Sequence, residues 1–208
     1  MSDLKLNVEE WKEFKINEVF TRFEQGKCSN STNLIDGDEI AYIGAKKSEN
    51  GVIKYATKQD NEGLISKGNC ICFICQGEGS SGYNNYYECD TIQTTSNVLG
   101  YNERMNKYSG LFLTTILDKE RFRFSFSRGR SNTLKQTKIK LPTTPQGAPD
   151  FDFMERYIKT RYDRLEKQTQ KKIKRKVVDL KKEEWKEFKI NEVFTRFEQG
   201  KCSNSTNL

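Results

Sequence analysis

Over its first 150 residues the chain carries short apolar runs separated by polar turns. Runs rich in β-branched and aromatic residues, bounded by turn signals such as Asn50-Gly51 and Glu62-Gly63, are typical of β-strands. They occupy residues 39–45, 51–57, 69–75 and 91–101. The third run, NCICFIC, is almost entirely apolar and predicts a buried strand. The pattern therefore predicts a β-rich body.

Three further segments of this body carry other patterns. The apolar spacing of residues 11–23 fits either a short strand with a helical turn or one amphipathic helix, and residues 111–118 fit a helix or a strand. Residues 121–128, RFRFSFSR, alternate strictly and predict a strand. In that strand Phe122, Phe124 and Phe126 would share one face and the arginines the other. A turn at 128–132 and the run TLKQTKIKLP would close the domain.

After residue 150 the periodicity changes to that of a helix. Residues 151–182 contain neither glycine nor proline, and Asp152 followed by Glu155 reads as a capping box. Apolar or neutral positions form one stripe along about 40 Å of helix, at about 1.5 Å per residue. The apolar members are Met154, Ile158, Tyr162, Leu165, Ile173, Val177 and Leu180. The stripe either pairs with another helix or packs back on the domain, and the helix length favours a partner helix.

One segment occurs twice. Residues 9–34 and 183–208 are identical, letter for letter. The chain is therefore expected to comprise a globular domain at 1–150, a long helix at 151–182 and the second copy at 183–208. The expected fold class is α+β, a mixed β-rich domain followed by a long helix that pairs as an antiparallel coiled coil.

The positive charge is concentrated in two stretches. Residues 1–150 hold 20 lysines and arginines against 19 acids, whereas residues 151–182 hold 12 against 5. Within the first part, residues 119–140 carry eight basic side chains and one acid, Glu120. Clustered positive charge suits a polyanion, nucleic acid above all, although a lysine-rich solvated surface has the same composition.

Several other classes of protein fit the sequence poorly. There is no histidine, which excludes Ser-His-Asp and Cys-His catalysis within the chain. Cys72 and Cys75 form one CxxC pair without a second, so buried reduced thiols are favoured over a structural metal. The N-terminus is polar, and no apolar run approaches the roughly 18 to 20 residues of a membrane span, so we expect a cytoplasmic protein.

Residues 77–82 satisfy the GxGxxG pattern but do not precede a helix-forming segment. A dinucleotide site needs a helix N-terminus there to hold the pyrophosphate. A glycine-rich turn that allows close approach of another chain, such as a DNA groove, is the better interpretation. Scattered carboxylates leave a metal-dependent nuclease as a weak alternative.

Three ordered blocks carry a family resemblance. They are WKEFKINEVFTRFEQGK at the start, ISKGNCICFICQGEGSSGYNNYYECDTIQTTSNVLGY in the middle, and SRGRSNTLKQTKIKLPTTPQGAPDFDFMERYIK leading into the long helix. Together they resemble the specificity subunits of type I restriction–modification systems and of related systems with a separate specificity protein.

The resemblance implies two target-recognition domains alternating with two long helices in a full-length subunit. Each domain reads one half of a split DNA site, and the paired helices set the distance between the halves. This chain would correspond to one domain and one helix. A homodimer with antiparallel helices would restore the whole arrangement and read an interrupted palindrome. The second copy of the repeat could dock on the partner's domain or exchange with the first copy.

The resemblance also implies that the chain is not an enzyme and binds no cofactor itself. Its partners would be double-stranded DNA, modification subunits that carry S-adenosylmethionine, and a restriction subunit in some complexes. A decoy that captures host modification subunits is the alternative role.

Residue types then suggest how DNA is contacted. Phosphate and groove contacts are expected from Arg121, Arg123, Arg128, Arg130, Lys135 and Lys138. Guanine would be read by Arg128 and Arg130, and adenine by Gln76, Asn84 and Asn132. Loop residues within reach of the groove would be Lys46, Lys47, Ser80, Ser81 and Tyr83. Each of these is equally compatible with an ordinary surface position.

Overall fold

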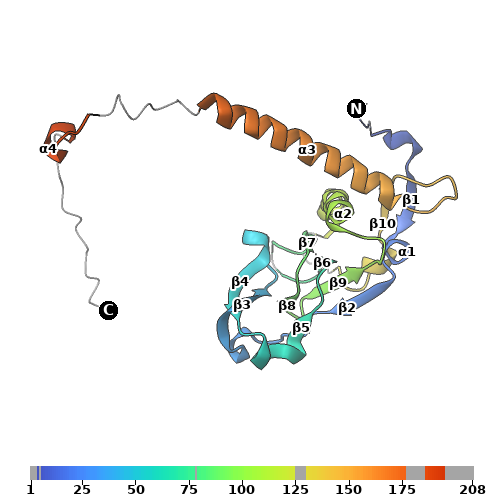
Figure 1. Ribbon diagram of the computed structural model, residues 1–208. Helices are drawn as coiled ribbons and strands as arrows, with labels where there is room; N and C mark the ends of the chain where they lie inside the picture. The colour runs from blue at the N-terminus through green and yellow to red at the C-terminus, as the bar shows by residue number, and fades with distance from the viewer. Residues whose placement is uncertain (1–3, 5, 78, 125–129, 177–185, 195–208) are drawn as a thin grey trace. The chain divides into compact units, whose positions relative to one another are not determined.

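The computed structural model describes residues 4, 6–77, 79–124, 130–176 and 186–194 (Figure 1). The chain divides into two compact units, Met1–Leu165 and Glu166–Leu208. The first unit contains every described β-strand and the first turns of the long helix. The second contains the rest of that helix and the described part of the second repeat copy.

The strands of the first unit form three small sheets. Strand β1 (Lys12–Lys15) pairs antiparallel with β10 (Lys138–Leu141). A second sheet has the order β2 (Arg22–Gln25), β9 (Asn97–Tyr101), β6 (Cys70–Ile74) and β7 (Asn84–Tyr87). The third has the order β4 (Val52–Ala56), β3 (Asp36–Ile43), β8 (Thr91–Gln93) and β5 (Ile65–Ser66). Only β3 and β8 pair in parallel among these described strands.

Four α-helices and several 3₁₀ turns complete the described chain. The α-helices are α1 (Ile16–Val19), α2 (Lys107–Lys119), α3 (Phe151–Lys176) and α4 (Ile190–Val193). The 3₁₀ turns are η1 (Val8–Glu10), η2 (Ser31–Asn33), η3 (Glu49–Gly51), η4 (Gln59–Leu64), η5 (Arg121–Phe124) and η6 (Leu134–Gln136). Within the described residues, no helix is long and apolar enough to cross a membrane.

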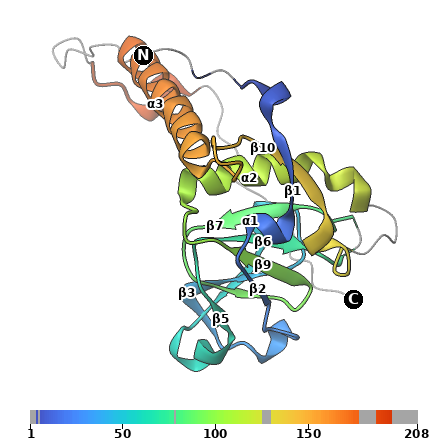
Figure 2. The same ribbon diagram turned by 90° about the vertical axis from the view of Figure 1, so that its right-hand side faces the viewer.

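Strand β6 is the centre of the domain. All five of its residues are buried, as the apolar run predicts. Ile71 and Phe73 face a core shared with α2, which lies across β7 and β6 (Figure 2). Cys70, Cys72 and Ile74 face a second core that also contains Ile43 of β3. The strand is therefore covered on both faces, which explains why it reads as continuously apolar.

Two ambiguous segments are settled by their capping and pairing. Residues 12–25 form a strand, a helical turn and a second strand, because β1 and β2 pair with different sheets. Residues 111–118 lie within helix α2. Its cap is Asn106, whose Oδ1 accepts hydrogen bonds from the backbone N–H groups of Tyr108 and Ser109.

The strand predicted over 121–128 is wrong where the chain is described. Residues 121–124 continue from the end of α2 as the 3₁₀ turn η5. Phe122 is 68% exposed, whereas Phe124 is buried, so the two do not share a face. Tertiary packing of Phe124 outweighs the alternating pattern. Phe126 lies outside the described residues.

The long helix begins at Phe151, and its cap is Asp150 rather than the predicted pair Asp152 and Glu155. The Phe153 N–H donates to Asp150 Oδ1 at 2.9 Å. Glu155 instead accepts a hydrogen bond from Asn106 Nδ2 at 2.7 Å. The helix start is thus fixed by Asp150 and held against the beginning of α2.

The predicted apolar stripe is divided between two environments. Met154 is fully buried in the domain core, and Ile158 is partly buried against the same core. Tyr162 and Leu165 are exposed, at 49% and 60%. The side chain of Ile173, and the whole of Val177 and Leu180, lie outside what the structure describes. The description of α3 ends at Lys176, short of the predicted 182.

Candidate nucleic-acid interface

A glycine turn follows the buried strand β6. Gly77, Gly79 and Gly82 all have positive φ angles, of 130°, 70° and 94°. A Cβ on Gly82 would lie 3.1 Å from the carbonyl oxygen of Arg121. Strand β7, not a helix, comes next, so the GxGxxG pattern is a turn packed against residues 121–124 and not a dinucleotide loop.

This turn brings three distant segments together, and we call residues 45–47, 76–77, 79–83 and 121–124 the loop cluster. Ser80 Oγ donates to the carbonyl oxygen of Ala45 at 2.7 Å. The guanidinium of Arg121 lies over the ring of Tyr83, with its Cζ 4.2 Å from the ring centroid. The glycine turn therefore contacts Ala45 and Arg121, and the predicted contact residues 46, 47, 76, 80, 81, 83, 121 and 123 lie within or next to these segments in sequence.

Several members of the loop cluster present polar groups to solvent. Lys47, Gln76 and Arg121 are exposed, and Lys47 and Arg121 form no ion pair within the described chain. Lys46 is partly buried and paired with Glu49. Arg123 is exposed but paired with Glu120 at 2.6 Å. Ser81 and Tyr83 are partly buried, and Ser81 Oγ donates to the Cys75 carbonyl at 3.3 Å.

Arg130, Asn84 and Ser80 are not surface contacts, which corrects the expectation for these three residues. Arg130 is fully buried, Asn84 is 2% exposed and Ser80 is 7% exposed. Asn84 and the Gly82 carbonyl come from a segment that is distant in sequence, and together with nearby Phe124 they enclose the arginine. DNA cannot reach any of the three side chains in this conformation.

The buried Arg130 side chain is bonded to the inner side of the glycine turn. Its Nη1 donates to Asn84 Oδ1 at 2.7 Å and to the Gly82 carbonyl at 3.2 Å. The guanidinium also lies over the rings of Phe73 and Phe124, 4.9 and 4.8 Å from their centroids. Burial lowers the pKa of Arg130 to about 10, so it remains a cation at neutral pH.

The remaining predicted contacts belong to the segment from 128 to 138. Lys135 is exposed, with its Nζ 5.2 Å from the centroid of Phe23. Lys138, on β10, pairs with Glu13 on β1 at 3.3 Å. Asn132 is exposed in the turn after Arg130, and Arg128 lies outside the described residues. Lys135 and Lys138 therefore lie beside side chains of the first repeat copy.

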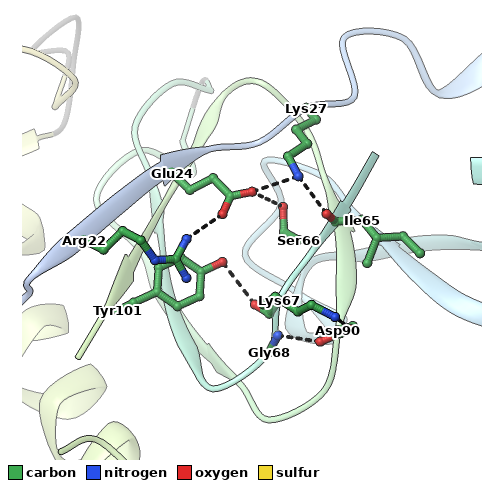
Figure 3. Close-up of polar contacts among 9 residues, drawn as sticks. All are labelled: Arg22, Glu24, Lys27, Ile65, Ser66, Lys67, Gly68, Asp90 and Tyr101. Atoms are coloured by element: carbon green, nitrogen blue, oxygen red, sulfur yellow. Dashed lines mark hydrogen bonds and ion pairs between the residues drawn. The ribbon is translucent and has the colours of Figure 1, made fainter. Parts of the chain in front are cut away.

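A second charged group on the domain escaped the sequence reasoning (Figure 3). Glu24 on β2 pairs with Arg22 at 2.9 Å and with Lys27 at 3.1 Å, and it accepts from Ser66 Oγ on β5. Arg22 also stacks on Tyr101, with its Cζ 3.6 Å from the ring centroid. The alternation of Arg22 and Glu24 along a strand was the available signal.

This charged group connects two sheets. Lys27 Nζ donates to the Ile65 carbonyl at 2.8 Å, which ties β2 to β5. Partial burial would raise the pKa of Glu24, but the hydrogen bonds and charges of Lys27 and Arg22 lower it overall. Asp90 pairs with Lys67 at 3.1 Å. The hydrogen bond that Asp90 accepts from the Gly68 N–H is the main cause of its lowered pKa. These cations are largely neutralised and stabilise the fold.

The cysteines in and directly after β6 are buried thiols. Burial raises the pKa of Cys70 to about 12 and that of Cys75 to about 11. Thiols with such values are poor metal ligands and poor nucleophiles at neutral pH. Among the described residues no group of three potential metal-ligating side chains occurs.

Residues 8–175 match the family described as the type I restriction modification DNA specificity domain. The chain belongs to this family. The match includes the loop cluster, the charged group around Glu24 and helix α3 to within one residue of its described end. The interpretation of the chain as a DNA-recognition component, rather than a catalytic one, is confirmed at the level of the family.

Individual relatives agree with this assignment. The chain is 26% identical over 160 residues to the type II restriction enzyme BgcI specificity subunit S.BcgI of Heyndrickxia coagulans. That alignment covers 76% of this chain and 46% of the relative. The chain therefore spans about half the length of this curated relative.

Two solved structures share the fold. The type I restriction–modification S subunit from M. genitalium superposes with a TM-score of 0.54 at 19% identity, over 79% of this chain and 41% of that one. The HsdS subunit from Thermoanaerobacter tengcongensis gives 0.51 at 12% identity, over 86% and 43%. The first is named as the S subunit of a type I restriction–modification system and the second as an HsdS subunit, and both extend well beyond the part matched here.

Proposed function

We propose that this chain reads one half of a split DNA site through the loop cluster and directs methyltransferase subunits to that site. The family match carries the proposal, and the loop cluster gives it a surface. Exposed Lys47 and Arg121 supply positive charge for phosphates, and exposed Gln76 supplies donors and acceptors for a base edge. The methyl donor, S-adenosylmethionine, would be bound by the partner modification subunit.

A homodimer would complete the recognition unit. The matched relatives are about twice as long as the aligned part of this chain. Two copies joined through α3 would place two loop clusters on one DNA molecule, related by a twofold axis. A twofold protein recognises a twofold site, so we infer an interrupted palindrome as the target.

The exposed part of the helix stripe provides the surface for pairing. Tyr162 and Leu165 are apolar side chains one turn apart on a charged helix, and both are exposed in the single chain. Burial of such a stripe against its own copy is the usual way for a long amphipathic helix to remove it from water. Met154 and Ile158 are already used by the domain core.

Two measurements test these proposals. Light scattering of the purified chain should give about twice 24.3 kDa, and Leu165→Gln should shift the mass toward the monomer. The control Glu166→Gln removes a neighbouring exposed charge and should leave the dimer intact. A monomeric wild-type chain, unchanged by its modification subunit, would refute the dimer.

The second measurement is sequencing of methylated adenines after the chain, its modification subunits and S-adenosylmethionine are incubated with random DNA. A single symmetric, interrupted motif is expected. Retained binding to the modification subunits without any DNA binding would instead identify a decoy.

A further inference from the structure

The second copy of the repeat reproduces the local structure of the first. Residues 186–194 have the same sequence as residues 12–20. In the first copy the Lys15 N–H donates to Glu18 Oε2 at 2.7 Å, and in the second the Lys189 N–H donates to Glu192 Oε2 at 3.1 Å. Each copy then forms one helical turn, INEV, closed by a 2.9 Å bond from the next phenylalanine. This local conformation is encoded by the segment itself.

The two copies differ sharply in burial. Phe14, Ile16 and Val19 of the first copy are 8%, 0% and 0% exposed. Their counterparts Phe188, Ile190 and Val193 are 64%, 67% and 58% exposed. Residues 186–194 therefore share the local conformation of residues 12–20, but these three apolar side chains are exposed.

The domain already contains a binding site for this sequence, and we call it the repeat site. It comprises strand β10, which pairs with β1, and the polar groups around α1. The Thr137 carbonyl accepts from the Ile16 N–H at 2.9 Å, and Asn102 Nδ2 donates to the Val19 carbonyl at 2.7 Å. Phe73 meets the ring of Phe20 edge to face, with centroids 5.3 Å apart. All of these partners recognise backbone or side chains that the second copy also has.

We propose that the second copy of one chain binds in the repeat site of another copy of this chain, in place of that chain's residues 12–20. The sequence identifies the occupant, because the exposed segment 186–194 is identical to the segment 12–20 that the site already holds. The exchange loses no contact of the site, since every group it uses is present in both copies. Two chains would thereby be joined through their domains as well as through their helices.

The length of α3 favours a site on another chain over the chain's own site. The helix start lies beside the repeat site, because the Asp150 N–H donates to the Pro142 carbonyl at 2.9 Å, next to Leu141, the partner of Lys12. The 26 residues of α3 extend about 39 Å from there at about 1.5 Å per residue. Residues 177–185 span at most about 36 Å when fully extended, which is less than the length of α3, so this connection is too short to return to the start of the helix.

Antiparallel helix pairing, which is part of the proposed function, removes this difficulty. The end of one helix then lies beside the start of the other, at an interaxial distance of about 8–10 Å. The second copy of one chain would be delivered to the repeat site of its partner. The preference for another chain rests on that proposed pairing.

Disulfide trapping tests the exchange in the full chain. Glu13 on β1 lies opposite Lys140 on β10, both exposed, and Glu187 is the counterpart of Glu13. Directly opposed residues on antiparallel strands are close enough to form a disulfide. A chain with Glu187→Cys is mixed with a chain with Lys140→Cys, both with Cys89→Ser and Cys202→Ser to remove competing thiols. Oxidation should yield a disulfide-linked pair of chains.

Two controls define the outcome. Glu13→Cys with Lys140→Cys in one chain should cross-link within the chain and shows that the register permits the bond. If this control forms while the mixed chains give no linked pair, the proposal is overturned. It is also overturned if Glu187→Cys and Lys140→Cys in one chain give only intrachain bonds, because the segment would then occupy its own domain.

A double-mutant cycle gives a second test without cysteines. Ile16→Asp disables the first copy, and the second copy should rescue the fold in a concentration-dependent way. Ile16→Asp with Ile190→Asp removes both copies and should lower the melting temperature much further, whereas Ile190→Asp alone should resemble the wild type. Equal loss in the single and double variants would overturn the exchange. A dimeric wild type with that result would leave helix pairing intact, so the two proposals fail separately.

Discussion

Arg130 donates a 2.7 Å hydrogen bond to Asn84, and both side chains lie inside the domain beneath the glycine turn. Asn84 passes the interaction on, because its Nδ2 donates to Asp118 Oδ1 at 2.9 Å. The Asn84 amide therefore links the Arg130 guanidinium to the Asp118 carboxylate, and no described hydrogen bond joins these two charged groups directly. Arg130, which the sequence suggested as a DNA contact, holds the glycine turn from inside the domain and is not part of its surface.

Asn84→Ala should destabilise the domain by about 2–3 kcal/mol, because a buried charged donor loses its acceptor. Urea unfolding followed by circular dichroism measures this. The control Asn132→Ala changes an exposed asparagine and should stay within about 0.5 kcal/mol of the wild type. Equal stabilities of the two variants would show that Arg130 finds another acceptor.

Arg121→Ala should weaken DNA binding more than Lys135→Ala if the loop cluster is the reading surface. Loss of one phosphate contact reduces the slope of log affinity against log salt concentration by roughly 1. Fluorescence anisotropy with the methylated-site DNA at several salt concentrations gives both quantities. A larger effect from Lys135→Ala would move the interface to the area around Phe23 and β10.

Gly82→Ala should cost more stability than Gly79→Ala, although both glycines have positive φ. A Cβ at Gly82 meets the Arg121 backbone at 3.1 Å, whereas a Cβ at Gly79 has no atom of the described chain within 4 Å. We expect about 2–3 kcal/mol for Gly82→Ala and about 1 kcal/mol for Gly79→Ala, which pays only the backbone strain. Thermal unfolding compares the two. The opposite order would mean that the turn does not pack on residues 121–124.

Stability should fall as the pH drops through roughly 4, partly because of Asp90 and Glu24. Both carboxylates have lowered pKa values in the folded domain, so the unfolded chain binds protons first. Their contribution is present above the unfolded pKa and is lost as the pH falls through the folded one. Asp90→Asn should flatten the acid side of a plot of melting temperature against pH. A wild-type slope in that variant would assign the acid sensitivity to other groups.

Local patterns predicted β3, β4 and β6 well because their apolar runs are bounded by clear turns, whereas the single predicted run at 91–101 divides into β8 and β9 of two different sheets. NCICFIC is buried on both faces, and its composition shows it. The segment RFRFSFSR was misread, since its alternation says nothing of Arg130, whose guanidinium covers Phe124. Arg130 itself was expected at the surface. Arginine is rarely buried, and its enclosure depends on Phe73, Asn84 and Gly82, which no local pattern connects to it.

The loop cluster could be predicted only as a set of residue types. Lys47, Gln76 and Arg121 are far apart in the chain, and their segments approach one another because the glycine turn packs closely on residues 45 and 121. The charged group around Glu24 was missed for a related reason. Its partner Ser66 is supplied by a strand of another sheet, 42 residues away.

The pairing of β1 with β10 joins the first and last strands of the domain in one narrow ribbon (Figure 2). The polypeptide thus enters and leaves the reading domain at a single point, directly before the helix that Asp150 caps. We call the residues between β1 and β10 a cassette, because both of its ends meet at this two-stranded sheet. A different cassette could be inserted between the same flanks without moving the helix, provided that it supplies new neighbours for Ile16 and Phe20. Under the proposed function, such an exchange would change the DNA specificity and leave the pairing helix unchanged.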